Sequence, residues 1–169
     1  MNKVNRAKYE NLVLYLCNGL GGQIEGKKKL AKLLYYVDFD HFEYDESMES
    51  VSGDSYKKWK MGPVPDTYME IVDSLIGQGK IERVEQDLGL EYPLEIFSAK
   101  ATADEDLFSN DEKMIIDRVI RKYGSLNGRQ LEALTHQEAP YIATEPDQEI
   151  AYELAFYRGT DFNDLAVTR

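Results

Sequence analysis

The side chains in this sequence that are most capable of catalysis or metal binding are its carboxylates, its two histidines and a single cysteine. Closely spaced acids such as Asp38 and Asp40 could in principle serve as a general acid and a general base. That chemistry depends on a distance and a pKa separation, and sequence spacing implies neither of them. We therefore interpret most of the acids as solvated surface groups. Asp38 is the exception, because it lies in the middle of the most apolar predicted helix.

His136 is the side chain best suited to proton transfer, because the unperturbed pKa of imidazole lies near neutrality. It follows Thr135 at the end of a short predicted helix, where a histidine more commonly bonds the last helix carbonyls, and we favour that structural role. Cys17 lies between Leu16 and Leu20 on an apolar helix face and is predicted to be a small core residue.

The sequence lacks the residues that a metal site or a cofactor site would need. Two histidines and one cysteine fall short of the usual zinc ligand sets. The sequence contains no G-x-S-x-G nucleophile elbow and no glycine-rich phosphate loop after a predicted strand. We therefore expect neither a metal nor a cofactor.

The net charge of −11 is unevenly distributed along the 169 residues. Residues 1–60 have a net charge of +1, whereas residues 61–169 have a net charge of −12. An acidic surface opposes non-specific binding to nucleic acid and attracts basic partners. The only basic cluster, Lys27–Lys29 with Lys32, is interpreted as a solvated helix face, with a nucleic-acid surface as the weaker alternative.

Nothing in the sequence indicates a membrane span or export. The longest uncharged stretch, residues 11–24, contains three glycines and is shorter than the ~20 apolar residues that a span requires. The first ten residues lead directly into a helical pattern rather than into a signal sequence. A single cysteine cannot form an internal disulfide, which suits a reducing compartment. We expect a cytoplasmic protein without a membrane partner.

Hydrophobic spacing predicts the helices that position the candidate residues. Helices are expected at about residues 4–18 and 26–42, and the second is apolar on more than one face, as central helices are. One of its apolar stripes consists of Tyr35, Phe39 and Phe42. A partner-binding groove is the alternative to burial for this stripe.

The middle of the chain is predicted to contain short strands and turns. A strand is expected around residues 54–60, followed at residues 61–65 by a turn that starts a helix with Pro65 at its first position. Residues 81–84 and 94–98 are expected to pair as a hairpin.

Local signals also mark the starts of the later helices. Ser109 with Glu112, and Asn127 with Gln130, have the spacing of capping boxes. Asp147 is predicted to cap a last helix. The sequence as a whole indicates one helix-dominated α+β domain over residues 1–169, with a small antiparallel β element.

Three segments, considered together, resemble a known family. Residues 29–38 read KLAKLLYYVD, and residues 59–65 read WKMGPVP. The C-terminal part carries Tyr123-Gly124, Leu131, Leu134-Thr135-His136 and Pro140-Tyr141. Their order and separation over about residues 5–160 resemble the SocA-like, or Panacea, antitoxin family. Met61 and Tyr141 stand where the family commonly has Tyr and Trp, and both keep a large apolar side chain.

The resemblance implies a protein that binds and neutralises a toxin encoded beside it and that has no enzyme activity. Some relatives resemble adaptors that deliver a toxin to the ClpXP protease, and many are carried by prophages. Residues 43–60 are further candidates for toxin contact. The resemblance and the aromatic pattern together give the candidate partner-binding residues Tyr35, Asp38, Phe39, Phe42, Trp59, Gly62, Pro63, Val64, His136 and Tyr141.

Two other functions stay open at this point. One is an interaction or adaptor protein of phage or prophage origin that has no dedicated toxin. The other is a hydrolase that uses His136 together with a nearby carboxylate. The sequence also leaves open the identity of the toxin and whether the protein is a monomer or a dimer.

Overall fold

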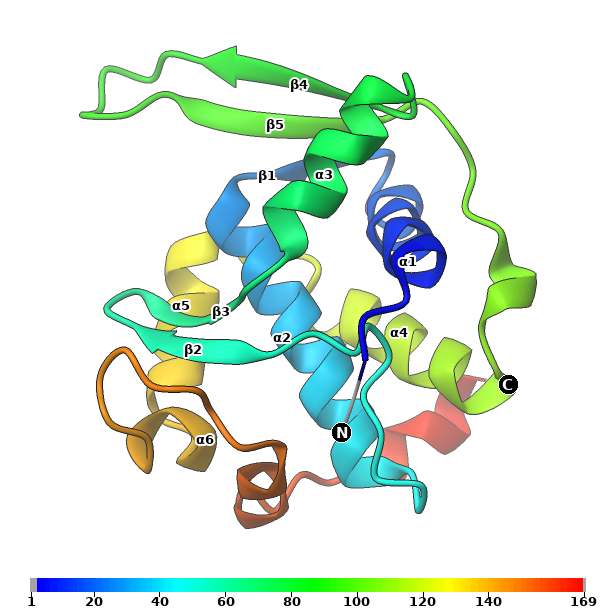
Figure 1. The fold of residues 1–169 in the computed structure, drawn as a ribbon, viewed down its shortest axis with the longest axis vertical. Coiled ribbons are helices and arrows are strands. Elements are labelled where there is room, and N and C mark those ends of the chain that lie inside the picture. The colour runs from blue at the N-terminus through cyan, green and yellow to red at the C-terminus, as the bar shows by residue number, and fades with distance from the viewer. Residues whose placement is uncertain (1–2, 169) are drawn as a thin grey trace.

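The computed structural model describes residues 3–168, and in this range helices dominate over two small antiparallel sheets (Figure 1). The predicted helix-dominated α+β class is therefore confirmed. In chain order the elements are α1 (Arg6–Gly19), β1 (Gln23–Glu25), α2 (Lys27–Tyr44), β2 (Tyr56–Trp59), β3 (Gly62–Pro65), α3 (Tyr68–Gly77), β4 (Ile81–Gln86), β5 (Leu94–Ala99), η1 (Glu105–Leu107), α4 (Asn110–Tyr123), α5 (Gly128–His136), α6 (Ala139–Ile142), η2 (Tyr152–Tyr157) and η3 (Asn163–Thr168).

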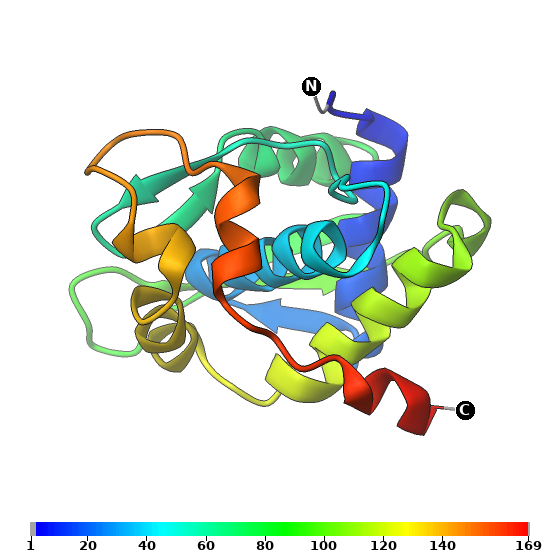
Figure 2. The ribbon, with the colours of Figure 1, turned by 90° about the horizontal axis from the view of Figure 1, so that it is seen from below.

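Helix α2 runs through the middle of the molecule (Figure 2). Every residue from Leu30 to Phe42 is buried, so no face of this part of the helix is left to solvent. The elements β1, β3, α4, α5 and η2 pack around it. A helix that is apolar on several faces needs such neighbours on each side, and the prediction of a central helix is confirmed.

The two sheets have different sizes and different partners. The larger sheet has the strand order β1-β5-β4, and both pairings are antiparallel. Its buried face is centred on Phe97, which lies opposite Ile24 of β1. The predicted hairpin is confirmed as β4–β5, whereas the three-residue strand β1 was not anticipated. The smaller sheet is the β2–β3 hairpin.

The predicted helix follows residues 61–65 as α3, but the prediction that Pro65, the last of these residues, starts it is wrong. These residues form the tip and second strand of the β2–β3 hairpin, in which Pro65 lies opposite Tyr56. Helix α3 begins only after Thr67. A two-stranded ribbon leaves open edges, and a proline costs little there because its missing N–H group is not required for a ladder.

The ends of several helices follow the local sequence. Asn5 caps α1, and its side-chain oxygen accepts a hydrogen bond from the Lys8 N–H group. The two predicted capping boxes, Ser109 with Glu112 and Asn127 with Gln130, are both formed. Short-range hydrogen bonds of this kind require only residues three positions apart, so the sequence indicates them directly.

Asp147 does not cap a helix, contrary to the prediction. Its φ angle is 67°, and its N–H group donates to the carbonyl of Lys58 at 2.9 Å. The following helix, η2, is a short 3-10 helix that begins after Ala151. A long-range contact with the β2–β3 hairpin therefore determines the conformation at this residue.

Asp38 is fully buried and fixes the polar segment that leads from α2 to β2. Its Oδ1 accepts hydrogen bonds from the N–H groups of Val51 at 2.9 Å and Ser52 at 2.8 Å. Its Oδ2 accepts from the Ser52 hydroxyl at 2.5 Å and the Tyr56 hydroxyl at 2.6 Å. Burial raises the pKa of Asp38, and the hydrogen bonds from Ser52 and Tyr56 oppose that rise.

A second buried carboxylate, Asp40, joins α2 to α4 and to the C-terminal segment. It accepts from Arg118 at 2.9 Å and from Arg158 at 2.6 Å. Arg158 also donates to Glu43 at 2.7 Å, and Arg118 donates to Asp164 at 2.8 Å. Burial raises the pKa of Asp40, whereas the guanidinium groups of Arg158 and Arg118 oppose that rise. Removing one partner from such a buried cluster costs about 3–5 kcal/mol.

We expect Asp38→Ala to lower the free energy of unfolding by about 3–5 kcal/mol, because it leaves two N–H groups and two hydroxyls buried without their acceptor. Urea denaturation followed by circular dichroism measures the change. The control is Asp73→Ala on the exposed side of α3, for which less than about 0.5 kcal/mol is expected. A loss below about 1 kcal/mol for Asp38→Ala would contradict the anchoring role.

Candidate functional site

The three sequence motifs meet at Gly62, where β3 begins. Gly62 is buried between Lys32 of α2 and Thr135 of α5. A Cβ atom on this residue would lie 2.6 Å from Lys32 Cε and 3.1 Å from Thr135 Oγ1. Its φ angle is 113°, a value that side-chain-bearing residues rarely adopt. Glycine therefore permits both the backbone conformation and the close approach of the three segments.

Lys32 is the innermost charged residue of this junction. It is 1% exposed, and its Nζ donates to the Pro63 carbonyl at 3.1 Å. Burial lowers the pKa of Lys32 to about 8, and the nearby Glu132 carboxylate opposes that shift. The prediction of a solvated lysine face is therefore wrong for Lys32, which lies one turn further into the helix than Lys28.

The outer part of the junction is aromatic. The rings of His136 and Tyr141 stack with their centroids 4.3 Å apart, and the Tyr141 hydroxyl donates to the Trp59 carbonyl at 2.9 Å. The ammonium of Lys58 lies 4.4 Å from the centre of the Tyr141 ring. Trp59 is 43% exposed, and Ile142, which follows Tyr141 in α6, is 62% exposed. We call Trp59, His136, Tyr141 and Ile142 the hairpin face.

The structure brings together six of the ten candidate residues at this junction. Trp59 is exposed and His136 and Tyr141 are partly exposed, whereas Gly62 and Pro63 are buried. Val64 follows in β3 and is partly exposed. Contacts between α5, α6 and the β2–β3 hairpin therefore assemble a surface from residues about 80 positions apart.

The other four candidate residues lie in the interior. Tyr35, Asp38 and Phe39 have no exposed surface, and Phe42 is 4% exposed. Tyr152 of η2 stacks on the rings of both Phe39 and Phe42. The prediction that this stripe of α2 is open to a partner is therefore corrected, because the C-terminal segment covers it. In this structure a partner cannot touch these four side chains.

His136 has no catalytic partner among the described residues. Its Nε2 atom is buried and forms no hydrogen bond within residues 3–168. A histidine general base needs an orienting group and a nearby nucleophile. The predicted bond from His136 to the last helix carbonyls is also not seen at Nε2, whereas the neighbouring Thr135 hydroxyl donates to the Glu132 carbonyl at 2.8 Å.

Sequence reasoning missed Glu138, which links α2 to the loop before α6. Its carboxylate accepts hydrogen bonds from the Tyr35 hydroxyl at 2.7 Å and the Tyr36 hydroxyl at 3.0 Å. Arg158 adds a contact at 3.3 Å. Its position in the sequence could have marked it as a candidate, because it lies between His136 and Pro140, two residues of one motif. Through these hydrogen bonds Glu138 connects α2, which carries the first motif, to the C-terminal motif.

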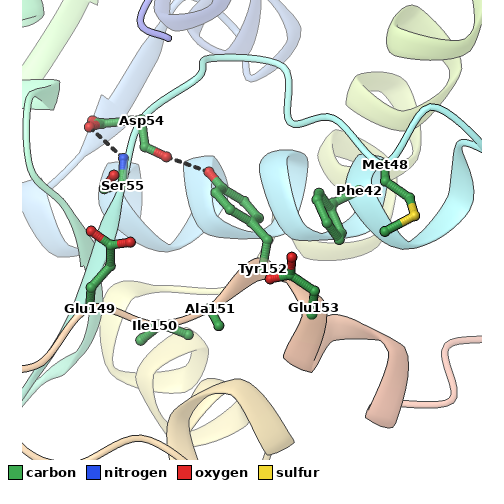
Figure 3. Close-up of a pocket in the computed structure, with 9 residues that line it drawn as sticks. All are labelled: Phe42, Met48, Asp54, Ser55, Glu149, Ile150, Ala151, Tyr152 and Glu153. Carbon is green, nitrogen blue, oxygen red and sulfur yellow. Dashed lines mark hydrogen bonds between the residues drawn. The ribbon is translucent and has the colours of Figure 1, made fainter. Parts of the chain in front are cut away.

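A separate polar hollow of about 330 Å³ lies where the C-terminal segment crosses α2 (Figure 3). The Tyr152 hydroxyl donates to the Asp54 carbonyl at 2.5 Å and closes one side of the hollow. Glu149 and Glu153 line it as well. Among the described residues, no group of three or more His, Cys, Asp or Glu side chains could hold a metal ion.

The remaining chemical candidate, Cys17, is fully buried. Burial raises the pKa of its thiol to about 12, so the thiol stays protonated at neutral pH. This agrees with the predicted core role. Among the described helices, none has the length and apolar character to cross a membrane.

The lysine-rich central helix, the Gly-Pro hairpin and the Thr-His segment thus form one contiguous unit in the structure. The chain matches the family described as antitoxin SocA-like, Panacea domain, over residues 30–141, and it belongs to this family. The matched range contains the hairpin and nearly all of the helix and C-terminal motifs. No protein of curated function and no solved structure matches the chain.

We expect Gly62→Ala to lower the free energy of unfolding by about 2–4 kcal/mol, since it adds backbone strain and a close contact with buried Lys32. Gly21→Ala is the matched control, because Gly21 also has a positive φ angle of 80° but has no atom near the added Cβ. For this control about 1 kcal/mol is expected. Urea denaturation compares the two variants, and equal losses would argue against tight packing at Gly62.

The lowered pKa of Lys32 predicts a pH dependence of stability. Between pH 8 and 10.5 the unfolded state binds more protons at Lys32 than the folded state, so the free energy of unfolding rises with pH. Relative to Lys32→Met, the wild-type protein should gain about 2 kcal/mol from pH 8 to 9.5. Urea denaturation at several pH values measures this difference. Lys80→Met, at an exposed position, should follow the wild type, and parallel curves for Lys32→Met would exclude the shift.

Proposed function

We propose that this chain is an antitoxin that binds a cognate protein toxin and neutralises it by covering it, without turnover of a substrate. Membership of the antitoxin SocA-like family supports a toxin as the partner. The observation that carries the proposal is the junction at Gly62, where the family's three motifs meet beside the exposed Trp59 and the partly exposed His136 and Tyr141. The hairpin face is the proposed contact surface for the toxin.

The hairpin face has the composition of a protein-binding surface. Trp59 and Tyr141 supply large rigid rings, and such residues commonly provide most of the binding free energy in an interface. Aromatic rings bury a large area while losing little conformational entropy. Ile142, the next residue after Tyr141, adds an exposed aliphatic side chain.

Internal contacts hold the hairpin face in place before any partner binds. The Tyr141 hydroxyl is bonded to the Trp59 carbonyl, and the Tyr141 ring contacts both the His136 ring and the ammonium of Lys58. The residues beneath, Gly62 and Lys32, are buried and closely packed. A surface that is rigid in the free protein loses less entropy on binding, which favours a tight complex.

The charge distribution suggests the chemistry of the toxin. Residues 61–169 have a net charge of −12, and long-range attraction accelerates encounter with a basic partner. We therefore propose a toxin that presents a basic surface. Covering this surface is the simplest route to neutralisation, and delivery of the toxin to a protease such as ClpXP is the alternative route.

The proposal predicts that a gene adjacent to the one for this chain stops growth when it is expressed alone, and that co-expression with this chain restores growth. Trp59→Ala should lower the number of surviving colonies, because loss of an aromatic anchor worth about 1.4 kcal/mol or more weakens binding of the toxin at least about ten-fold. Tyr157→Ala, which removes a 78% exposed ring from η2, is the matched control and should protect fully.

The abundance of the adjacent protein separates the two routes in the same cultures. Covering the toxin leaves its level unchanged or higher, whereas delivery to a protease lowers it. Absence of toxicity from any adjacent gene would refute the antitoxin proposal. Full protection by Trp59→Ala would refute the hairpin face as the contact surface.

A further inference from the structure

A second candidate surface lies between the two hairpins. The β2–β3 and β4–β5 hairpins extend to the same side of the molecule, as both ribbon views show (Figures 1 and 2). A groove of about 700 Å³ lies between them, and residues 26–28 at the N-terminal end of α2 also line it. Met61 at the tip of one hairpin and Leu88, Leu90 and Tyr92 at the tip of the other line this groove. We call it the hairpin groove.

The apolar side chains of the hairpin groove are unusually exposed. Tyr92 is 75% exposed, Leu90 69%, Met61 56% and Leu88 49%. Single exposed apolar residues are ordinary, but several that line one groove commonly mark a surface that another molecule covers. Covering them removes apolar area from water, at about 25 cal/mol for each Å².

The charge at this end of the β4–β5 hairpin has one sign. Residues 84–99 contain four acidic residues and no Lys or Arg. Glu85 of β4 lies directly opposite Glu95 of β5, an arrangement in which like charges destabilise a strand pair. Glu95 lies 3.4 Å from Lys27 and 4.0 Å from Arg83. Within residues 3–168, Glu85 has no Lys or Arg side chain within 4.0 Å.

The two lysines that line the groove are already paired. Lys27 faces Glu95, and the Lys28 ammonium lies 2.7 Å from Glu132. The charge of the hairpin groove that lacks a counter-ion is therefore that of Glu85, and it is negative. The occupant that fits this surface is apolar and cationic.

We propose that the hairpin groove binds a segment of a partner protein that combines apolar side chains with an arginine or lysine. The apolar side chains pack against Leu90, Tyr92 and Met61, and the cation lies against Glu85 and relieves its repulsion with Glu95. A second copy that paired groove to groove does not fit, because it would bring a second acidic hairpin against the first. This inference goes beyond the antitoxin proposal, since it concerns a different surface and holds whichever protein carries the segment.

Selection of displayed peptides tests the proposal while the partner protein is still unidentified. A phage library of random 12-residue peptides is selected on the wild-type protein, after removal of phage that bind the double variant Leu90→Asp/Tyr92→Asp. We expect the enriched peptides to combine apolar residues with Arg or Lys. Both substituted side chains are exposed, so circular dichroism and urea denaturation should show an unchanged fold.

Fluorescence anisotropy with an enriched peptide then tests the charge. Glu85→Lys should weaken binding at least about ten-fold, equivalent to about 1.4 kcal/mol or more. Glu153→Lys, an equal charge change at an exposed position on η2, should have little effect. Tyr157→Asp is the matched control for the apolar substitutions.

Three results would overturn the proposal: no enrichment after the subtraction step, enrichment of acidic peptides, or equal binding by Glu85→Lys. None of them bears on the antitoxin proposal, because synthetic peptides take the place of the toxin. The growth assay with Trp59→Ala remains the separate test of that function.

Discussion

The complete burial of α2 between Leu30 and Phe42 determines where most of the chain must lie. Its polar side chains lose water on every side, and each needs a partner from another element. Lys32 uses the Pro63 carbonyl of the β2–β3 hairpin, and Asp38 uses the segment before β2. His41 Nδ1 lies 2.6 Å from the Glu49 carbonyl. The same contacts that satisfy the helix therefore hold the hairpin, and with it the proposed toxin surface, in place.

Much of the fold could be predicted because its signals are local. The capping boxes join residues three apart, and the helical spacing repeats within each segment. The start of β3 could not be predicted in this way, because the fixed φ angle of proline suits an extended strand as well as a first helical turn. The burial of Lys32 could not be predicted either, since only its contact with the distant Pro63 carbonyl distinguishes it from Lys28, one helical turn earlier.

The candidate site shows the same division between local and long-range information. Trp59, His136 and Tyr141 could be named from motif resemblance, but their assembly required a contact across about 80 residues. The residue spacing of an aromatic stripe on a helix is the same whether a partner protein or another part of the same chain covers it. For Phe39 the cover is Tyr152, more than a hundred residues later, and no pattern within α2 reveals this.

The family match ends at residue 141, but acidic residues of the matched segment form ion pairs with a residue beyond it. Asp40 lies within it, and one of its two guanidinium partners is Arg158, which is 17 residues beyond the match. Arg158 is also bonded to Glu43 and Glu138, so three carboxylates of the matched segment share this one external cation. A chimaera in which residues 30–141 were joined to other termini would lack Arg158. Asp40, Glu43 and Glu138 would then lose the cation that they share. The transplantable unit of this protein is therefore longer than the family signature that identifies it.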